Sequence, residues 1–176
     1  MKVCLDNLHS VYLIAAGGFC VIQLNDPKFP DDNLRKLRIR ILQEECEEYK
    51  VADADNDIIE IADALADMSY LICGTAITYG IAPQKLEFEP LFSDLILDSD
   101  LAGFPMKHLR IARSNEMDYW FNNYLEHEEN NNITGVTESL SFLMDAVSGT
   151  AYAFRIPLLE VFDEVHRSNM SKLGLD

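Results

Sequence analysis

Hydrophobic residues recur every three to four positions along most of this chain, a spacing that places them on one face of an α-helix. Proline, glycine and polar clusters divide the pattern into separate segments. These segments predict helices over roughly 3–16, 32–52, 56–80, 86–97, 106–128, 134–154 and 157–172. No segment alternates convincingly with the period of two that a strand requires. The chain is therefore predicted to form an all-α helical bundle built on antiparallel helix hairpins.

Local signals support two of the connections. Either Asp31 or Asp32 can cap the helix that begins near residue 32, because a carboxylate there accepts hydrogen bonds from the first free N–H groups. The stretch Leu125–Gly135 is polar enough to be a surface turn between two helices.

The chain also contains a faint internal repeat. Cys73–Pro83 resembles Ser148–Pro157 at an offset of 75 residues, and Leu34–Tyr49 resembles Met106–Trp120 at an offset of about 72. We therefore expect one domain over 1–176, with repeat halves at about 1–85 and 86–176. Chance similarity between helix hairpins is the alternative.

If the repeat is real, its second half has lost most of the acids of the first. Gly135, Glu138 and Phe142 fall where Glu60, Asp63 and Asp67 stand. One catalytic half and one supporting half would follow.

Composition narrows the class of protein. The 176 residues suit one compact domain, and 30 acidic against 14 basic residues give a net charge of −16. Such a charge opposes binding to nucleic acid or to an anionic membrane, so we expect neither partner. An anionic substrate would need a cation to bridge it.

The cysteines and the most apolar stretch indicate a cytoplasmic protein. None of the four cysteines forms a CxxC pair, so we expect free thiols in a reducing compartment. They are Cys4, Cys20, Cys46 and Cys73. The apolar stretch Val11–Leu24 is too short to span a bilayer and is interrupted by Gly17 and Gly18.

Carboxylates on two consecutive helices form the strongest chemical signal. If the helices are antiparallel and the turn is centred on residue 54, Glu45 lies level with Asp63 and Glu48 lies level with Glu60. Each pair within a helix is spaced i,i+3, which places both acids on one face. A cluster of four carboxylates is the expectation.

A solvated helix face is the ordinary explanation for such acids, and we accept it for Glu44 and Glu47, since Arg40 can pair with Glu44. It fits the other acids poorly, because no Lys or Arg occurs from Val51 to Gln84. Clustered like charges are costly unless a cation or protonation neutralises them. Mg²⁺, with Mn²⁺ as a substitute, suits an all-oxygen ligand set, whereas zinc would have no obvious ligands.

At these residues the sequence resembles the all-α nucleoside triphosphate pyrophosphohydrolases, which include MazG-like proteins, phosphoribosyl-ATP pyrophosphohydrolases and dimeric dUTPases. Their pattern of ExxE followed by ExxD stands here as Glu45-x-x-Glu48 and Glu60-x-x-Asp63. The resemblance implies that these four residues hold Mg²⁺. It also implies hydrolysis of a nucleoside triphosphate to the monophosphate and pyrophosphate. Glu48 is the first candidate for the catalytic base and Glu45 the second.

The C-terminal stretch Glu160–Gly174 extends the resemblance. It implies that Arg167, Asn169 and Lys172 bind the substrate phosphates, which suits the forked donors of Arg and the mobile charge of Lys. The alternative is a helix end whose basic residues favour the dipole. The family also implies a homodimer, or a pseudo-dimer within one chain.

Three functions stay open on the sequence. The first is a Mg²⁺-dependent pyrophosphohydrolase of a (deoxy)nucleotide, such as dUTP or another non-standard dNTP. The second is a non-catalytic acidic helical protein that binds a partner or mimics DNA. The third is phosphoribosyl-ATP hydrolysis. Four aromatic residues are candidates for stacking on a base, and none is assigned: Tyr70, Tyr79, Trp120 and Tyr124.

Overall fold

The computed structural model describes residues 26–81, 86 and 106–172, and these residues form five long α-helices and no strand. The helices are α2 (Asp32–Asp55), α3 (Ile58–Thr78), α4 (Met106–Glu129), α5 (Ile133–Phe154) and α6 (Leu158–Lys172). The all-α prediction is confirmed, and each of these helices begins and ends within three residues of its predicted bounds. The predicted helix over 3–16 and residues 87–97 of the next lie outside the described residues.

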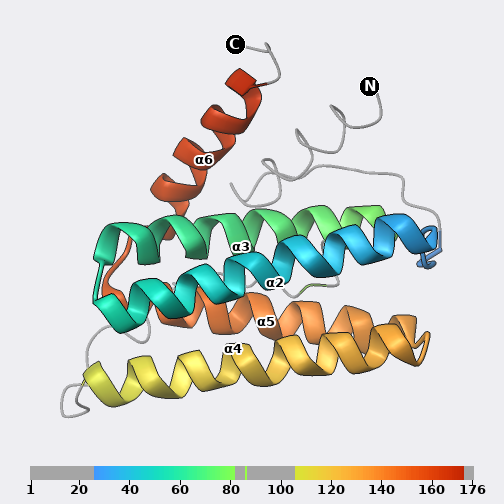
Figure 1. Cartoon of the computed structure of the whole chain (residues 1–176), viewed down its shortest axis with the longest axis horizontal. Helices are drawn as coiled ribbons and strands as arrows, with labels where there is room; N and C mark the ends of the chain where they lie inside the picture. Colours follow the sequence, from blue (N-terminus) through green and yellow to red (C-terminus); the bar gives the residue numbers. More distant parts are fainter. Residues whose placement is uncertain (1–25, 82–85, 87–105, 173–176) are drawn as a thin grey trace.

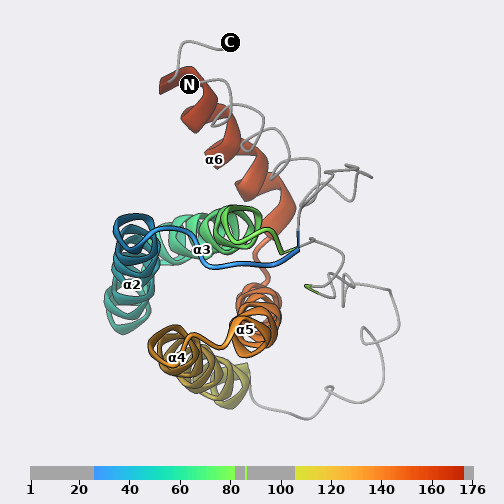
Figure 2. The same cartoon turned by 90° about the vertical axis from the view of Figure 1, so that its right-hand side faces the viewer.

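Two antiparallel hairpins, α2–α3 and α4–α5, stack on each other to form the bundle (Figure 1). The hairpins meet mainly through α3 and α5, while α2 faces α4. Helix α6 follows α5, packs against α3, and then projects away from the four-helix bundle (Figure 2).

The core lies between the hairpins and draws most of its side chains from α3 and α5. Among the largest fully buried side chains are Ile61, Leu65, Met68, Leu140 and Leu143. Their spacing is that of one helix face, which explains why burial of this stripe stabilises the helices. Helix α3 is long and apolar enough to span a bilayer, but 67% of its most apolar window is buried, as in a core helix of a bundle.

Asp31, rather than Asp32, caps α2. Its side chain accepts hydrogen bonds from the backbone N–H groups of Asn33 at 3.0 Å and Leu34 at 3.1 Å. Asp32 is the first residue of the helix, where its charge suits the positive end of the helix dipole.

The two hairpin turns have the same backbone geometry at an offset of 75 residues. Asn56 closes α2 with φ 55°, and Asn131 occupies the same place after α4 with φ 52°. The N–H of Asp57 donates to the carbonyl of Ala52, and the N–H of Asn132 donates to that of His127, both at 2.9 Å.

The ends of α3 and α5 match at the same offset. The N–H of Ile81 donates to the carbonyl of Ala76, and the N–H of Ile156 donates to that of Ala151, both at 2.9 Å. A single offset of 75 residues therefore relates the two hairpins, and the offset of about 72 expected for α2 and α4 is wrong. A common origin of the halves stays a prediction. We call residues 75 apart equivalent positions.

Candidate active site

Glu45 lies at the centre of an acidic cluster between α2 and α3. It is half-buried, and burial raises the pKa of its carboxyl to about 7, with further contributions from the charges of Asp67, Glu48, Asp63 and Glu44 in that order. The four charges that contribute most to this shift are all negative. Acids of both helices therefore act on Glu45, while the predicted cluster of Glu45, Glu48, Glu60 and Asp63 stays a prediction.

The register of the hairpin differs from the expected one. Helix α2 ends at Asp55 and α3 begins at Ile58, so the turn is centred near residue 56 rather than 54, and position 45 lies closest to level with position 67. Asp67 is also the charge that contributes most to the raised pKa of Glu45. Asn56 is the left-handed residue at the turn, because α2 continues as far as Asp55. The predicted level pairs, Glu45 with Asp63 and Glu48 with Glu60, are therefore shifted.

A second contact supports this register. A Cβ atom built on Gly74 would lie 3.1 Å from Nη1 of Arg38, so these two residues face each other across the same pair of helices. The positions 38 and 74 are also symmetric about 56. The position of the turn and the approach of Arg38 to Gly74 thus agree on the alignment of α2 against α3.

The remaining predicted ligands lie around this centre at different depths. Glu48 and Asp63 are exposed but contribute to the raised pKa of Glu45. Glu60 is exposed in the first turn of α3 and is not among the charges that raise that pKa. Asp67, which was not among the predicted ligands, contributes the most of any charge to the raised pKa of Glu45.

The donor set fits a hard divalent cation by its chemistry, since it consists of carboxylates and α3 contains no Lys or Arg to neutralise them. Within the described ranges, however, no group of three His, Cys, Asp or Glu side chains is arranged to hold a metal as it stands. Cation binding would therefore require rotation of the exposed carboxylates toward Glu45.

The predicted surface acids behave as expected. Arg40 pairs with Glu44 at 3.6 Å on the exposed side of α2, and Gln43 donates to Glu47 at 2.9 Å. These contacts separate Glu44 and Glu47, which face solvent, from the partly buried Glu45.

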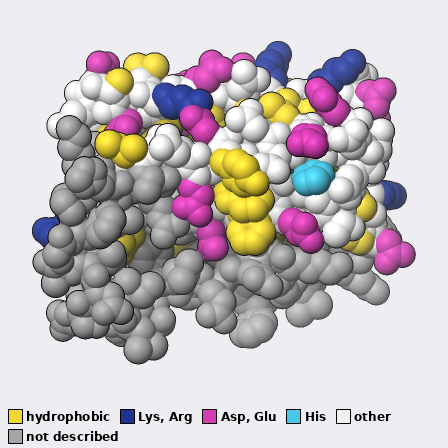
Figure 3. Space-filling model, turned by 90° about the horizontal axis from the view of Figure 1, so that it is seen from below, with side chains coloured by type: hydrophobic (Ala, Val, Ile, Leu, Met, Phe, Trp, Pro, Cys, Tyr) yellow, Lys and Arg dark blue, Asp and Glu magenta, His cyan; other side chains and the backbone are white. Residues whose placement is uncertain are grey.

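The second hairpin carries aromatic rings where the first carries its acids. Trp120 and Phe142, equivalent to Glu45 and Asp67, stack with centroids 4.3 Å apart and planes at 16°. Their direct contact supports the cross-helix register found for the acids. Tyr119 packs on Trp120 at 4.9 Å, and Phe142 is 44% exposed. Figure 3, which views the α4–α5 side, shows hydrophobic side chains gathered between acidic ones.

The equivalent of Glu60 in the second hairpin is Gly135, where a Cβ atom would lie 2.4 Å from the ring of His127. A glutamate could not stand there without displacing that ring. Glu48 is replaced by Asn123, so Glu138, equivalent to Asp63, is the one acid kept among the four ligand positions.

Helix α6 crosses α3 next to the acidic cluster. Tyr70, one turn beyond Asp67 on α3, packs on Phe162 at 5.6 Å and on His166 at 6.1 Å. Because positions 67 and 70 share a face of α3, α6 lies beside this cluster.

The three predicted phosphate-binding residues of α6 do not share one face. Arg167 is 72% exposed and pairs with Glu164. Asn169 is half-buried and lies about 200° from Arg167 around the helix. Position 172 is on the side of Asn169, but the side chain of Lys172 lies outside the described residues. Their assignment to phosphate stays a prediction.

Other features do not extend the site. Tyr79 and Tyr124 are fully buried in the core, which leaves neither open to a base. A pocket of about 360 Å³ lies between α2 and α4, where Arg35 and Glu128 already pair with each other. The free thiols predicted for Cys46 and Cys73 are confirmed, and both are buried.

Residues 22–89 match the family model of phosphoribosyl-ATP pyrophosphohydrolase. No curated protein and no solved structure was found to match the chain. The matched residues contain α2, the turn at Asn56 and α3, and therefore all the acids around Glu45. This part of the chain is therefore similar to a family of the all-α MazG-like nucleoside triphosphate pyrophosphohydrolase superfamily, a family of hydrolases of phosphoric anhydrides in nucleotides.

Proposed function

We propose that this protein is a Mg²⁺-dependent pyrophosphohydrolase that converts a nucleoside triphosphate, such as dUTP or another non-standard dNTP, to the monophosphate and pyrophosphate. The observation that carries the proposal is the environment of Glu45, a half-buried carboxyl whose pKa is raised by burial and by the charges of four neighbouring acids. A triphosphate is itself an anion, so it can approach such a cluster only together with cations.

The chain's own residues would divide the work by their depth. A divalent cation, when bound, would neutralise the phosphates and make an attacking water more acidic. Glu45 and Asp67 lie deepest and would anchor the cation, with Glu48 and Asp63 turning inward from the rim. Glu48 or Glu45 would orient the water and accept its proton.

Phosphoribosyl-ATP is the second candidate substrate, and the family match favours it about as strongly. The same α–β phosphoric anhydride would be cleaved in both cases. The acidic cluster supports this cleavage equally for either substrate.

The proposal can be tested by incubating the purified chain with Mg²⁺ or Mn²⁺ and a panel of standard and modified nucleoside triphosphates, together with phosphoribosyl-ATP. We expect monophosphate and pyrophosphate in equal amounts. In ¹⁸O-labelled water the label should enter the monophosphate, since the attack is at the α-phosphorus. Diphosphate with orthophosphate would reject this chemistry, and absence of turnover on the whole panel would reject the enzyme.

Matched variants distinguish a specific role of Glu45 and Glu48 from a general effect of removing negative charge. Glu45→Gln and Glu48→Gln should each lower kcat by about 100-fold or more, because a base or a metal ligand is removed. Glu47→Gln, an exposed neighbour on α2, is the control and should retain activity. A non-catalytic acidic binding protein would show no turnover. Its binding to a partner would change by a similar amount in all three variants and would not require a metal.

A further inference from the structure

Helix α2 carries five cations, and four of them face away from α3. Arg35 and Lys50 pair with Glu128 and Asp118 of α4, Arg40 pairs with Glu44 on the surface, and Lys36 lines the pocket toward α4. Arg38 differs from these four, because it faces α3 across the seam that also contains Glu45. Helix α3 itself contains no Lys or Arg.

The absence of a side chain at Gly74 leaves room for the guanidinium of Arg38. The missing Cβ would stand 3.1 Å from Nη1 and 3.8 Å from both Cζ and Nη2, so the planar group lies against the backbone of α3. Arg38 is half-buried and its Nε is fully enclosed. The position of this cation is therefore determined by packing, unlike that of a lysine free in solvent.

Arg38 and the acidic cluster lie along the same seam. Arg38 precedes Glu45 by seven residues on α2, and Gly74 follows Asp67 by seven residues on α3. Seven residues are about two helical turns, or roughly 10.5 Å along the axis. Arg38 thus stands about two turns from the acids. A triphosphate chain, together with the side chains of Arg38 and Glu45, can span this separation.

We propose that Arg38 binds the β- and γ-phosphates of the substrate, the part that departs as pyrophosphate, while the acidic cluster acts at the α-phosphate. This inference rests on the proposed function. The terminal phosphates carry most of the negative charge, and an Arg fork can contact two phosphate oxygens at once. Within α2 and α3, Arg38 is the cation positioned on the seam to receive them.

A purely structural role for Arg38 has a built-in control in the second hairpin. The equivalent positions there are Arg113 and Gly149, so the Arg and Gly residues are kept where the acids are replaced. Arg113→Met, which removes the residue at the equivalent position of the second hairpin, is therefore the control variant for Arg38→Met. A phosphate-binding role predicts that the two variants differ.

The test is calorimetric titration of pyrophosphate, in the presence of Mg²⁺, into the full chain and its variants. We expect Arg38→Met to raise the Kd for pyrophosphate at least tenfold and Arg113→Met to leave it within about twofold. Nucleoside monophosphate should bind Arg38→Met as it binds the wild type. Loss of monophosphate affinity with unchanged pyrophosphate affinity would overturn the assignment, as would equal effects of the two Met variants.

Two further variants keep the inference testable if Arg38→Met does not fold. Arg38→Lys keeps the charge without the fork and should weaken pyrophosphate binding by a smaller factor. Gly74→Ala should displace the guanidinium by a few tenths of an ångström and weaken binding with the charge intact. Wild-type affinity in both variants would overturn the proposal.

Failure of the inference differs from failure of the proposed function. A wild-type chain that binds pyrophosphate through Arg38 but hydrolyses no nucleotide rejects the enzyme and supports the phosphate site. A chain that hydrolyses nucleotides while Arg38→Met binds pyrophosphate normally rejects the role of Arg38 alone.

Discussion

At the scale of single residues, Glu45 shows how an acid can be identified as a candidate ligand. Its exposed neighbours Glu44 and Glu47 contact Arg40 and Gln43, as surface glutamates commonly do. Glu45 instead combines partial burial with acidic neighbours on both helices. Both effects disfavour its charged form, so the metal-free site should hold a proton near neutral pH.

This environment predicts a pH dependence of stability. Because folding raises the pKa of Glu45 from 4.5 to about 7, the folded state binds more protons between these values, and stability from this group is lost as pH rises through about 7. Discounted for solvent screening, the loss should be about 1 kcal/mol, or about 2–4 °C in Tm. Thermal melts in chelator from pH 5 to 8 should show it, and Mg²⁺ should reverse it.

Glu45→Gln is the decisive variant for this dependence, and it should flatten the slope of Tm against pH in chelator. Glu47→Gln should leave the slope as in the wild type. Equal slopes for wild type and Glu45→Gln would contradict the assigned environment.

At the scale of helices, the start of α3 determines where its acids lie. Asp57 accepts hydrogen bonds from the backbone N–H groups of Ile59 at 3.1 Å and Glu60 at 3.3 Å. Asn132 caps α5 by accepting from the N–H of Gly135 at 3.1 Å. Both caps follow directly on a left-handed Asn, so each turn is short and leaves little freedom to slide one helix against the other.

Removal of either cap should destabilise the fold by a similar amount. Asp57→Ala and Asn132→Ala should each cost about 1 kcal/mol, since N-terminal N–H groups lose their acceptor. Midpoints of urea unfolding would measure this. Asp55→Ala is the control, because an acid at the end of α2 faces the negative pole of the dipole and its loss should be neutral or slightly stabilising. A larger effect of Asp55→Ala than of Asp57→Ala would contradict the assignment of the cap.

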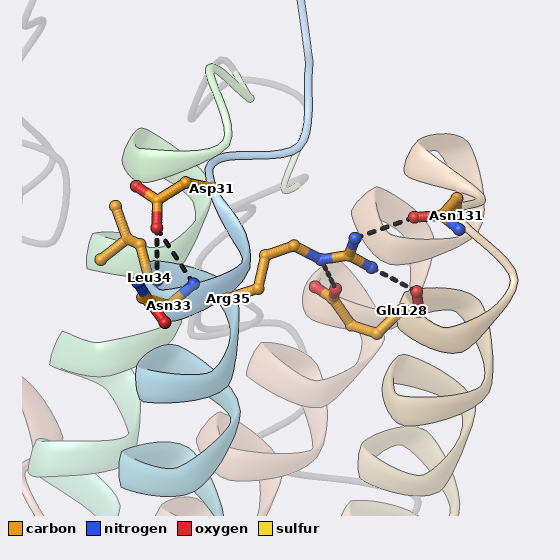
Figure 4. A network of polar contacts seen from close by, with 6 residues as sticks. All are labelled: Asp31, Asn33, Leu34, Arg35, Glu128 and Asn131. Atoms are coloured by element: carbon orange, nitrogen blue, oxygen red, sulfur yellow. Dashed lines mark hydrogen bonds and ion pairs between the residues drawn. The ribbon is translucent and has the colours of Figure 1, made fainter.

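At the scale of the whole molecule, a buried ion pair links the two hairpins (Figure 4). Nε of Arg35 donates to Oε2 of Glu128 at 3.0 Å, and Nη1 donates to Oδ1 of Asn131 at 2.8 Å. Nη2 also donates to the backbone carbonyl of Glu128, and the Cζ atom lies 4.3 Å from the ring centroid of Phe29. Glu128 is only 2% exposed, so its charge depends on Arg35.

Removing one partner of the Arg35–Glu128 pair should lower the free energy of unfolding strongly, whereas replacing both partners with apolar residues should lower it much less. Arg35→Met should destabilise the fold by about 3–5 kcal/mol, because a buried carboxylate loses its cation. The double variant Arg35→Met with Glu128→Leu should recover much of that loss, since two apolar side chains leave no buried charge. Unfolding in denaturant would compare them, and a double variant as unstable as Arg35→Met would contradict this account.

Much of the candidate site is local in sequence and could be predicted. The i,i+3 spacing of Glu45 with Glu48 and of Glu60 with Asp63 required only helical geometry and the absence of basic residues on the second helix. The role of Asp67 could not be predicted equally well, because a shift of two residues in the turn changes which acids lie level. The signal that could have revealed it was the polar Asn56, a residue type that tolerates the left-handed conformation.

The sequence by itself determined the five described helices and the grouping of acids on two consecutive helices, since these depend on residues three or four positions apart. Only the tertiary structure decided the register of α2 against α3, the placement of Arg38 on Gly74, and the burial of Glu128 beneath Arg35, which lies 93 residues away. Such contacts depend on how separate elements pack, because a side chain's burial and charge environment are set by distant parts of the chain.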